Sequence, residues 1–350
     1  MSSRTYVGTK AFALKGSLLD SVTVQKLAEA SSLEELVNRL RGSPYADVMS
    51  ALSAPYTAKQ IELALRERLA VVHRSITQGA GRYAILQLYY LRNVAWDVKI
   101  ALKAKALNRT YEETVEYLNM KAEGLIGRRD LMIRVLTAKD IGEAVAMLSG
   151  TEFSQDVEKA LASYSSTGEV RFFDLYVDRA VLSAISREYS LNSRLYAARS
   201  SRPKGVGDMV ALDVDSYNAV GVLRAKLWGL KESDIQELMV APTRRASHTL
   251  LSGMAAAESV SESIKLLEPV YRFPTAGAQS DEESIDMVED AFAKELHRTA
   301  ELAFVWQGLS AGTILALIKL LEFEVSNLSA IAIGVEAGME PKAIMAKLAV

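Results

Sequence analysis

Cysteine is absent from this 350-residue chain, which excludes disulfide bonds, thiolate nucleophiles and cysteine-ligated metals. An intracellular location is the default expectation for such a chain. The chain also lacks a large excess of either charge, since its formal net charge is only −2. A nearly neutral chain has no general electrostatic footprint for nucleic acid, so no nucleic-acid partner is expected.

Long hydrophobic runs are also missing. The longest apolar stretch, residues 309–318, is about half of the ~20 residues that a membrane-spanning helix needs. The first residues lack the apolar region of a signal peptide. A soluble protein, or one peripheral to a membrane, is therefore expected. Proline is scarce, with 7 residues, and no alternating apolar and polar pattern competes with helical periodicity. The predicted fold class is all-α.

Sequence signals for catalysis are few. The chain has no GxxxxGK[ST] loop and no HExxH motif, so no nucleotide, cofactor or metal site is expected. One acidic pair, Asp174 and Asp178, has the i, i+4 spacing that places two carboxylates on one helix face. This pair keeps open an alternative, an all-α magnesium-dependent lyase or transferase, although the DDxxD cluster of such enzymes is absent. A second alternative is a helical adaptor that binds peptides.

What the chain does contain is a repeated motif in which a helix ends in a tight turn. Three copies have the same spacing, and the first along the chain is the weakest: Asp97, Ala101, Ala104 and Asn108; Asp215, Asn218, Val222, Ala225 and Gly229; Glu324, Asn327, Ile331, Gly334 and Gly338. Counted from the Asn or Asp, position 7 is always Gly or Ala, which lets another backbone approach closely. Position 11 is always a residue that tolerates positive φ, which predicts the end of the helix. The polar side chain at the start of the count is expected to bind a neighbouring backbone.

A second repeat has the same period. Three amphipathic segments with acidic first turns are predicted to be helices, and they align Leu33, Ile141 and Val260 at their starts. Both repeats recur after roughly 110 to 120 residues, which is too long for the usual helical solenoids. We therefore expect three similar helical bundles, at residues 1–120, 121–240 and 241–350.

These repeats resemble a known family. The segment EFEVSNLSAIAIGVEAGMEPKAI is similar to the C-terminal motif of the C subunit of archaeal-type rotary ATP synthases, which is related to the d subunit of vacuolar ATPases. The segments LEELVNRLRGSPY, TAKDIGEAVAMLSGT and LSAGTILALIKLLEFEVSNL resemble that family in order and spacing. The resemblance covers essentially the whole chain. Its departures are Asp97 where the later copies have Asn, and Asn108 where they have Gly.

The resemblance implies a structure and a role. It implies three helical domains around a pseudo-threefold axis, forming a funnel without an active site or cofactor. Such a subunit belongs to the central stalk of a proton- or sodium-translocating enzyme and couples the shaft subunits to the membrane proteolipid ring. Its location is peripheral, on the cytoplasmic face of the membrane. Arg224 and Lys226, near a motif helix, are candidate residues for the socket that holds the shaft.

Overall fold

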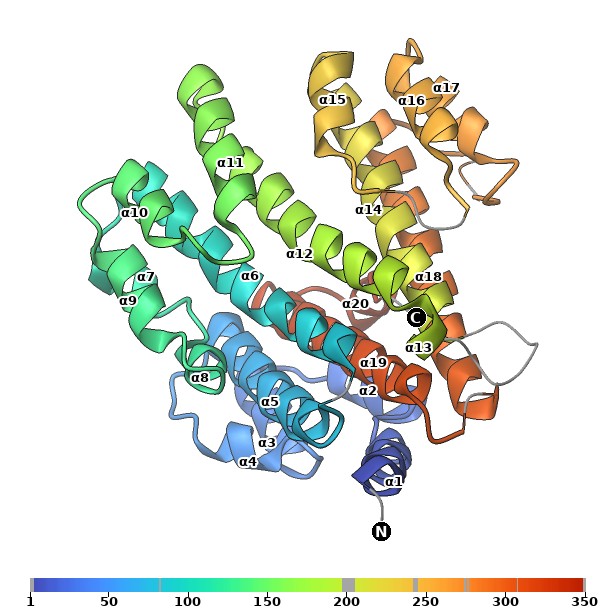
Figure 1. Ribbon diagram of the computed structural model, residues 1–350. Coiled ribbons are helices and arrows are strands. Elements are labelled where there is room, and N and C mark those ends of the chain that lie inside the picture. The colour runs from blue at the N-terminus through green and yellow to red at the C-terminus, as the bar shows by residue number, and fades with distance from the viewer. Residues whose placement is uncertain are drawn as a thin grey trace. The chain divides into compact units, whose positions relative to one another are not determined.

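The computed structural model describes residues 3–81, 83–196, 205–241, 245–273, 275, 277–306 and 308–348 (Figure 1). Every regular element within these ranges is a helix, which confirms the predicted all-α class. In this part of the chain no helix is both long enough and apolar enough to cross a membrane.

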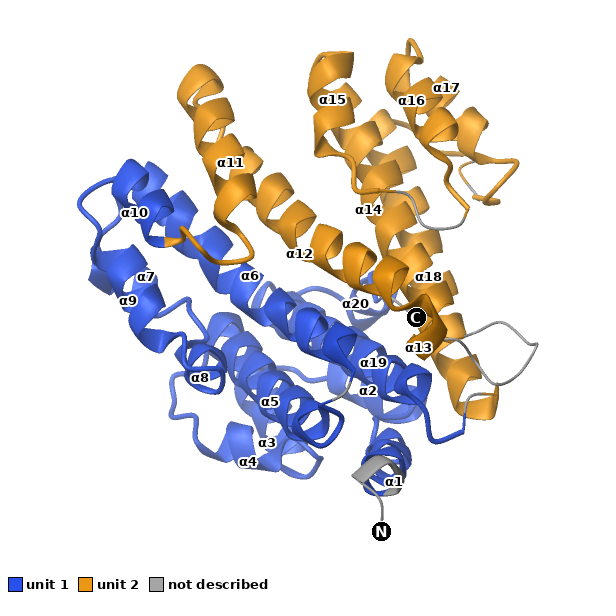
Figure 2. Ribbon diagram, viewed as in Figure 1, with its two compact units in different colours: residues 1–147, 308–350 blue, residues 148–307 orange. Residues whose placement is uncertain are grey.

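Backbone contacts group the chain into two compact units (Figure 2). Unit 1 joins residues 1–147 to residues 308–350, and unit 2 comprises residues 148–307. The C-terminal motif helix thus belongs with the N-terminal part of the chain. The division at residues 1–120, 121–240 and 241–350 stays a prediction, and so does the pseudo-threefold arrangement.

Unit 1 combines three long helices with several short ones. Its helices are α1 (Ser3–Lys15), α2 (Ser21–Ala28), α3 (Leu33–Arg41), α4 (Ala46–Ser50), α5 (Ala58–Gly79), α6 (Ala84–Ala106), α7 (Tyr111–Val115), α8 (Met120–Gly124), α9 (Arg129–Thr137), α10 (Ile141–Met147), α19 (Ala311–Glu336) and α20 (Pro341–Met345).

Helix α19 is the centre of unit 1. Its residues are apolar around most of the helix, so it is buried over most of its length, and it packs on α5, α1, α2 and α3. Helix α5 begins at the predicted capping box, in which Thr57 Oγ1 accepts from Gln60 N at 3.2 Å. The carboxylate of Glu336 on α19 accepts from the first amide of α5, Ala58 N, at 2.8 Å. Unit 1 is therefore fastened by contacts between segments far apart in sequence.

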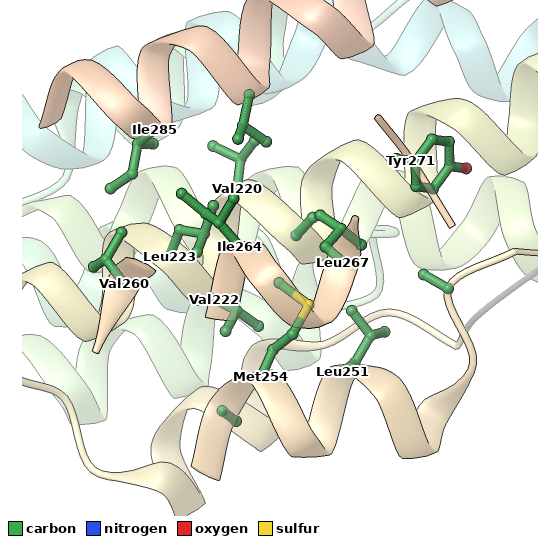
Figure 3. Packing of buried hydrophobic residues seen from close by; sticks show 14 of the residues in the cluster. Val220, Val222, Leu223, Leu251, Met254, Val260, Ile264, Leu267, Tyr271 and Ile285 are labelled. Carbon is green, nitrogen blue, oxygen red and sulfur yellow. The ribbon is translucent and has the colours of Figure 1, made fainter. Parts of the chain in front are cut away.

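Unit 2 combines three long helices with several shorter ones. Its helices are α11 (Ser154–Thr167), α12 (Arg171–Leu191), α13 (Ser193–Tyr196), α14 (Val206–Leu227), α15 (Glu232–Leu238), α16 (His248–Ala256), α17 (Val260–Leu267) and α18 (Asp281–Trp306). Helix α14 packs on α12, α16, α17 and α18. Figure 3 shows the core between these helices, where Val220 and Leu223 of α14 lie near Ile264 of α17 and Ile285 of α18.

The three helices of the second repeat begin where the sequence predicts, at Leu33, Ile141 and Val260. Each is capped in the same way, by a Ser or Asp oxygen that accepts from the amide of a Glu three residues later, and the pairs are Ser32 with Glu35, Asp140 with Glu143 and Ser259 with Glu262. Each motif helix packs on the second-repeat helix of one copy: α6 on α10, α14 on α17, and α19 on α3. The first two motif helices therefore pack on the second-repeat helix that follows them in the chain. The last motif helix, α19, packs on the first second-repeat helix, α3.

Candidate functional site

The three motif helices end in the same turn. The residue at position 11 has positive φ in every copy, 55° at Asn108, 71° at Gly229 and 64° at Gly338, which confirms the predicted turns. The next amide donates to the carbonyl oxygen five residues earlier, in the pairs Arg109 to Ala104 (2.8 Å), Leu230 to Ala225 (3.0 Å) and Met339 to Gly334 (2.9 Å). This is the Schellman pattern, which satisfies a carbonyl that the helix leaves without an intrahelical partner.

Position 7 is a close contact in the third copy. A Cβ atom added to Gly334 would lie 2.6 Å from Cγ1 of Ile344, a side chain that is 2% exposed. In the second copy Ala225 and Ile235 occupy the equivalent places, and both are buried. The small residue at this position therefore lets the short helix after the turn fold back against the motif helix.

In two of the three copies the polar residue that begins the count bonds to the backbone, as the spacing predicts. In α14, Asn218 Nδ2 donates to the carbonyl oxygen of Val240 at 2.9 Å, and Val240 N donates to Asn218 Oδ1 at 2.8 Å. In α6, Asp97 Oδ1 accepts from Asn119 N at 2.9 Å. All three bonds span 22 residues. On α19 Asn327 is half-buried, and the residue 22 positions later lies outside the described residues.

In the second and third copies, a carboxylate three residues before the Asn accepts a hydrogen bond from a tyrosine hydroxyl. Asp215 accepts from Tyr271 Oη at 2.6 Å and from Ala246 N at 3.2 Å. Glu324 accepts from Tyr45 Oη at 2.7 Å and from the amide of Leu19 at 2.5 Å. Burial raises the pKa of both carboxyl groups, and the hydroxyl and amide donors lower it.

These tyrosines were missed from the sequence, although a signal existed. Tyr45 and Tyr271 each follow a second-repeat helix, and Phe153 has the corresponding place in the middle segment. Phe153 has no hydroxyl group, and the first copy also lacks the carboxylate that would accept from one, since Val94 lies three residues before Asp97. The first copy therefore has a different set of buried polar groups.

In the first copy two carboxyl groups are buried together. Asp97 on α6 and Glu123 on α8 are each 0% exposed. Burial is the largest cause that raises the pKa of each group, and the charge of Asp97 raises that of Glu123 further. Glu123 was not singled out from the sequence, since its spacing from Asp97 matches no repeated position.

Both candidate socket residues have partners inside unit 2. Arg224 Nη2 lies 2.5 Å from Glu289 Oε2, and both side chains are exposed. Lys226 Nζ donates to the carbonyl oxygen of Ala255 at 2.9 Å and to that of Ala257. Lys226 thus caps the C-terminus of α16, a favourable place for a cation. A role of either residue in binding a shaft stays a prediction.

Asp174 and Asp178 lie on α12, where both are half-buried. The next residue, Arg179, pairs with Asp156 of α11 at 2.5 Å. Within the described ranges, no group of three or more His, Asp or Glu side chains is arranged to hold a metal ion. The motif helices, in contrast, carry buried polar side chains, such as Asn218 and Asp97, that bind the backbone of segments beyond the turn.

Comparison with known proteins shows similarity along almost the whole chain. The family model of the ATP synthase (C/AC39) subunit matches residues 7–347. The C subunit of the A-type ATP synthase of Haloferax volcanii is 28% identical over 357 residues, which covers 100% of this chain and 98% of the relative. The protein of the same name from Methanothermobacter thermautotrophicus is 27% identical over 335 residues, covering 93% of this chain and 82% of the relative. By this match along almost its entire length, the chain belongs to the ATP synthase (C/AC39) subunit family.

Proposed function

We propose that this chain is the C subunit of an A-type rotary ATP synthase, a non-catalytic part of the central stalk that links the shaft subunits to the membrane proteolipid ring. The observation that carries the proposal is the family match over residues 7–347. Relatives with this subunit's name align along most of both chains, so the likeness concerns the whole subunit rather than one motif. Its location would be peripheral, on the cytoplasmic face of the membrane, through the ring.

The internal chemistry suits a mechanical role. The buried Asn218, Asp97 and Asp215 use their oxygen or nitrogen atoms to hold backbone or tyrosine groups within the same unit. A buried hydrogen bond leaves a costly unsatisfied group when it breaks, so the segments held to these helices resist local opening. A stiff subunit loses less work to its own deformation when torque passes through it. No cofactor is part of the proposal.

The three equivalent turns support three similar domains about a pseudo-threefold axis, which would enclose the shaft. Of the two candidate socket residues, Arg224 is the better one, because its guanidinium is exposed whereas Lys226 is engaged by α16. Reversing the charge of Arg224 should weaken shaft binding, and the loss should be greater at low salt because salt screens exposed ion pairs. Glu289→Gln breaks the internal ion pair but leaves the positive charge of Arg224 in place. If this variant still binds the shaft normally, the loss in the charge-reversed variant comes from a shaft contact and not from the broken internal pair.

The proposal is tested by affinity capture of the tagged chain from native membrane extracts. The central-stalk subunits and the proteolipid ring should be recovered with it, while the purified chain alone should hydrolyse no ATP. A folded chain that captures neither the stalk nor the ring would refute the coupling role. ATP hydrolysis by the purified chain would refute the non-catalytic assignment.

A further inference from the structure

The buried carboxyl pair of the first copy has too few hydrogen-bond donors. Asp97 Oδ1 accepts from Asn119 N, at the start of α8. The other oxygen of Asp97 and both oxygens of Glu123 are buried, and none has a donor among the residues that the structure describes. Two ionised carboxylates in such a place would repel each other without water to screen them. One proton held between the two groups removes the repulsion and supplies one donor between them.

In the second copy, a neutral Asn218 amide stands where the first copy has the Asp97 carboxyl group. Asn218 both donates to and accepts from Val240, so one neutral amide ties the motif helix to the segment after the turn. Asp97 occupies the place of Asn218 but cannot donate when ionised. A protonated Glu123 provides an O–H group beside it. The acid pair can thus do in the first copy what one amide does in the second, provided that it keeps a proton.

Charged groups around the pair do not take over the role of the proton. From α5, Arg66 pairs with Glu62 at 2.8 Å and stacks over Trp96, while Arg74 donates to Gln87. Glu67 of α5 pairs with Lys121 of α8. At the start of α9, Arg128 lowers the pKa of Glu123, and Arg66 lowers that of Asp97, but burial is the larger cause in both cases. The pKa of the nearby Tyr90 hydroxyl is itself raised, and this hydroxyl donates to the carbonyl oxygen of Ala122.

We propose that Asp97 and Glu123 form a proton-dependent latch, in which one shared proton holds α8 against α6 and its loss to solvent at alkaline pH releases α8. This inference concerns the isolated chain and is independent of the proposed function. It would make the stiffness of one motif copy respond to the pH around it, whereas the amide of the second copy would not respond.

The direction of the pH effect follows from the raised pKa values. Burial raises the pKa of Glu123 from 4.5 to about 9, so the closed state keeps a proton that the open state releases. The stabilisation is fully present below the ordinary pKa and is lost as pH rises through about 9. Between these limits, the equilibrium constant for opening should rise up to about tenfold per pH unit, the value for one proton.

Hydrogen exchange of the α8 amides from pH 6 to pH 9 tests the latch on the purified full chain. After division by the intrinsic exchange rate, opening in the wild type should increase with pH, up to about tenfold per unit. Glu123→Gln should remove most of this pH dependence, because it replaces the group with the larger rise in pKa by a neutral amide. Asp97→Asn should weaken the dependence without abolishing it, because burial still raises the pKa of Glu123 when the charge of Asp97 is gone. Glu112→Gln, an equal change at an exposed residue of α7, should keep the wild-type dependence.

Opening of α8 that does not depend on pH in the wild type would overturn the latch, as would an unchanged dependence in Glu123→Gln. A second readout does not depend on any variant. The carbon-13 shift of the Glu123 carboxyl group should be that of a protonated acid at pH 7. A shift typical of an ionised carboxylate at pH 7 would overturn the proposal even if both variants fail to fold.

Discussion

Replacing Gly334 by alanine should change the stability of the protein in two opposing ways, by favouring the helix and by crowding Ile344. In the interior of α19, alanine should stabilise the helix by about 0.5–1 kcal/mol because glycine has the greater freedom in the unfolded chain. The added Cβ, however, would lie 2.6 Å from Cγ1 and 2.9 Å from Cδ1 of Ile344. Overpacking of this kind typically costs ~1–3 kcal/mol. Because the crowded Cγ1 is not the free end of the side chain, we expect the cost to win, with a net loss of up to about 2 kcal/mol.

Gly221 provides the matched control. It lies inside α14, another motif helix, and an added Cβ there would meet no atom within 4 Å. Gly221→Ala should therefore show only the helical gain of about 0.5–1 kcal/mol. In an Ile344→Ala background the obstacle is removed, so Gly334→Ala should become stabilising as well. Leucine at position 334 should be worse than alanine in the wild-type background.

Urea denaturation followed by circular dichroism measures these differences as shifts of the unfolding midpoint. The expected pattern is a lower midpoint for Gly334→Ala, a higher one for Gly221→Ala, and a change of sign for Gly334→Ala in the Ile344→Ala background. If Gly334→Ala stabilises the wild type as much as Gly221→Ala does, the close packing at position 7 is wrong.

Four further substitutions, at three positions, test the turn, the amide and the tyrosine of the second copy. Gly229→Val should cost ~1–3 kcal/mol in unfolding free energy because a β-branched residue is strained at φ 71°, and Gly229→Asn should cost less; equal losses would contradict this. Asn218→Ala should cost about 2–4 kcal/mol in urea denaturation, since it leaves two buried Val240 backbone groups unsatisfied, and a loss below about 1 kcal/mol would count against that bond pair. Tyr271→Phe removes a donor that lowers the raised pKa of Asp215, so its cost of about 1.5–3 kcal/mol at pH 7 should shrink as the pH falls and the acid takes up a proton. A cost of Tyr271→Phe that stays constant from pH 7 to pH 4 would refute that account.

Local features of this fold could be predicted from the sequence because their causes are local. Positive φ at Asn108, Gly229 and Gly338 follows from residue types that tolerate it at the end of an apolar stripe. The starts of α3, α10 and α17 follow from a cap residue and a Glu three positions later. The backbone role of Asn218 could also be expected, since a polar residue on a packing face needs a partner.

The partners of those residues could not be predicted. Glu324 binds Leu19 and Tyr45, which are 305 and 279 residues away in sequence. Helical periodicity says which face is buried, but it carries no information on which distant segment covers that face. The carboxyl pair was hidden for another reason: Glu123 looks like an ordinary charged residue of a short helix, and charged residues are mostly exposed. Only its packing against Asp97 reveals it as a buried acid.

Sedimentation of a reconstituted mixture tests the central claim, that this chain joins a rotary shaft to a proteolipid ring. Purified shaft subunits and detergent-solubilised ring from the same A-type enzyme are run on a density gradient with and without the chain. The account predicts that the shaft migrates with the ring only when the chain is present, in a complex that contains all three. A shaft that binds the ring equally well without the chain, or a folded chain that migrates alone, would contradict it.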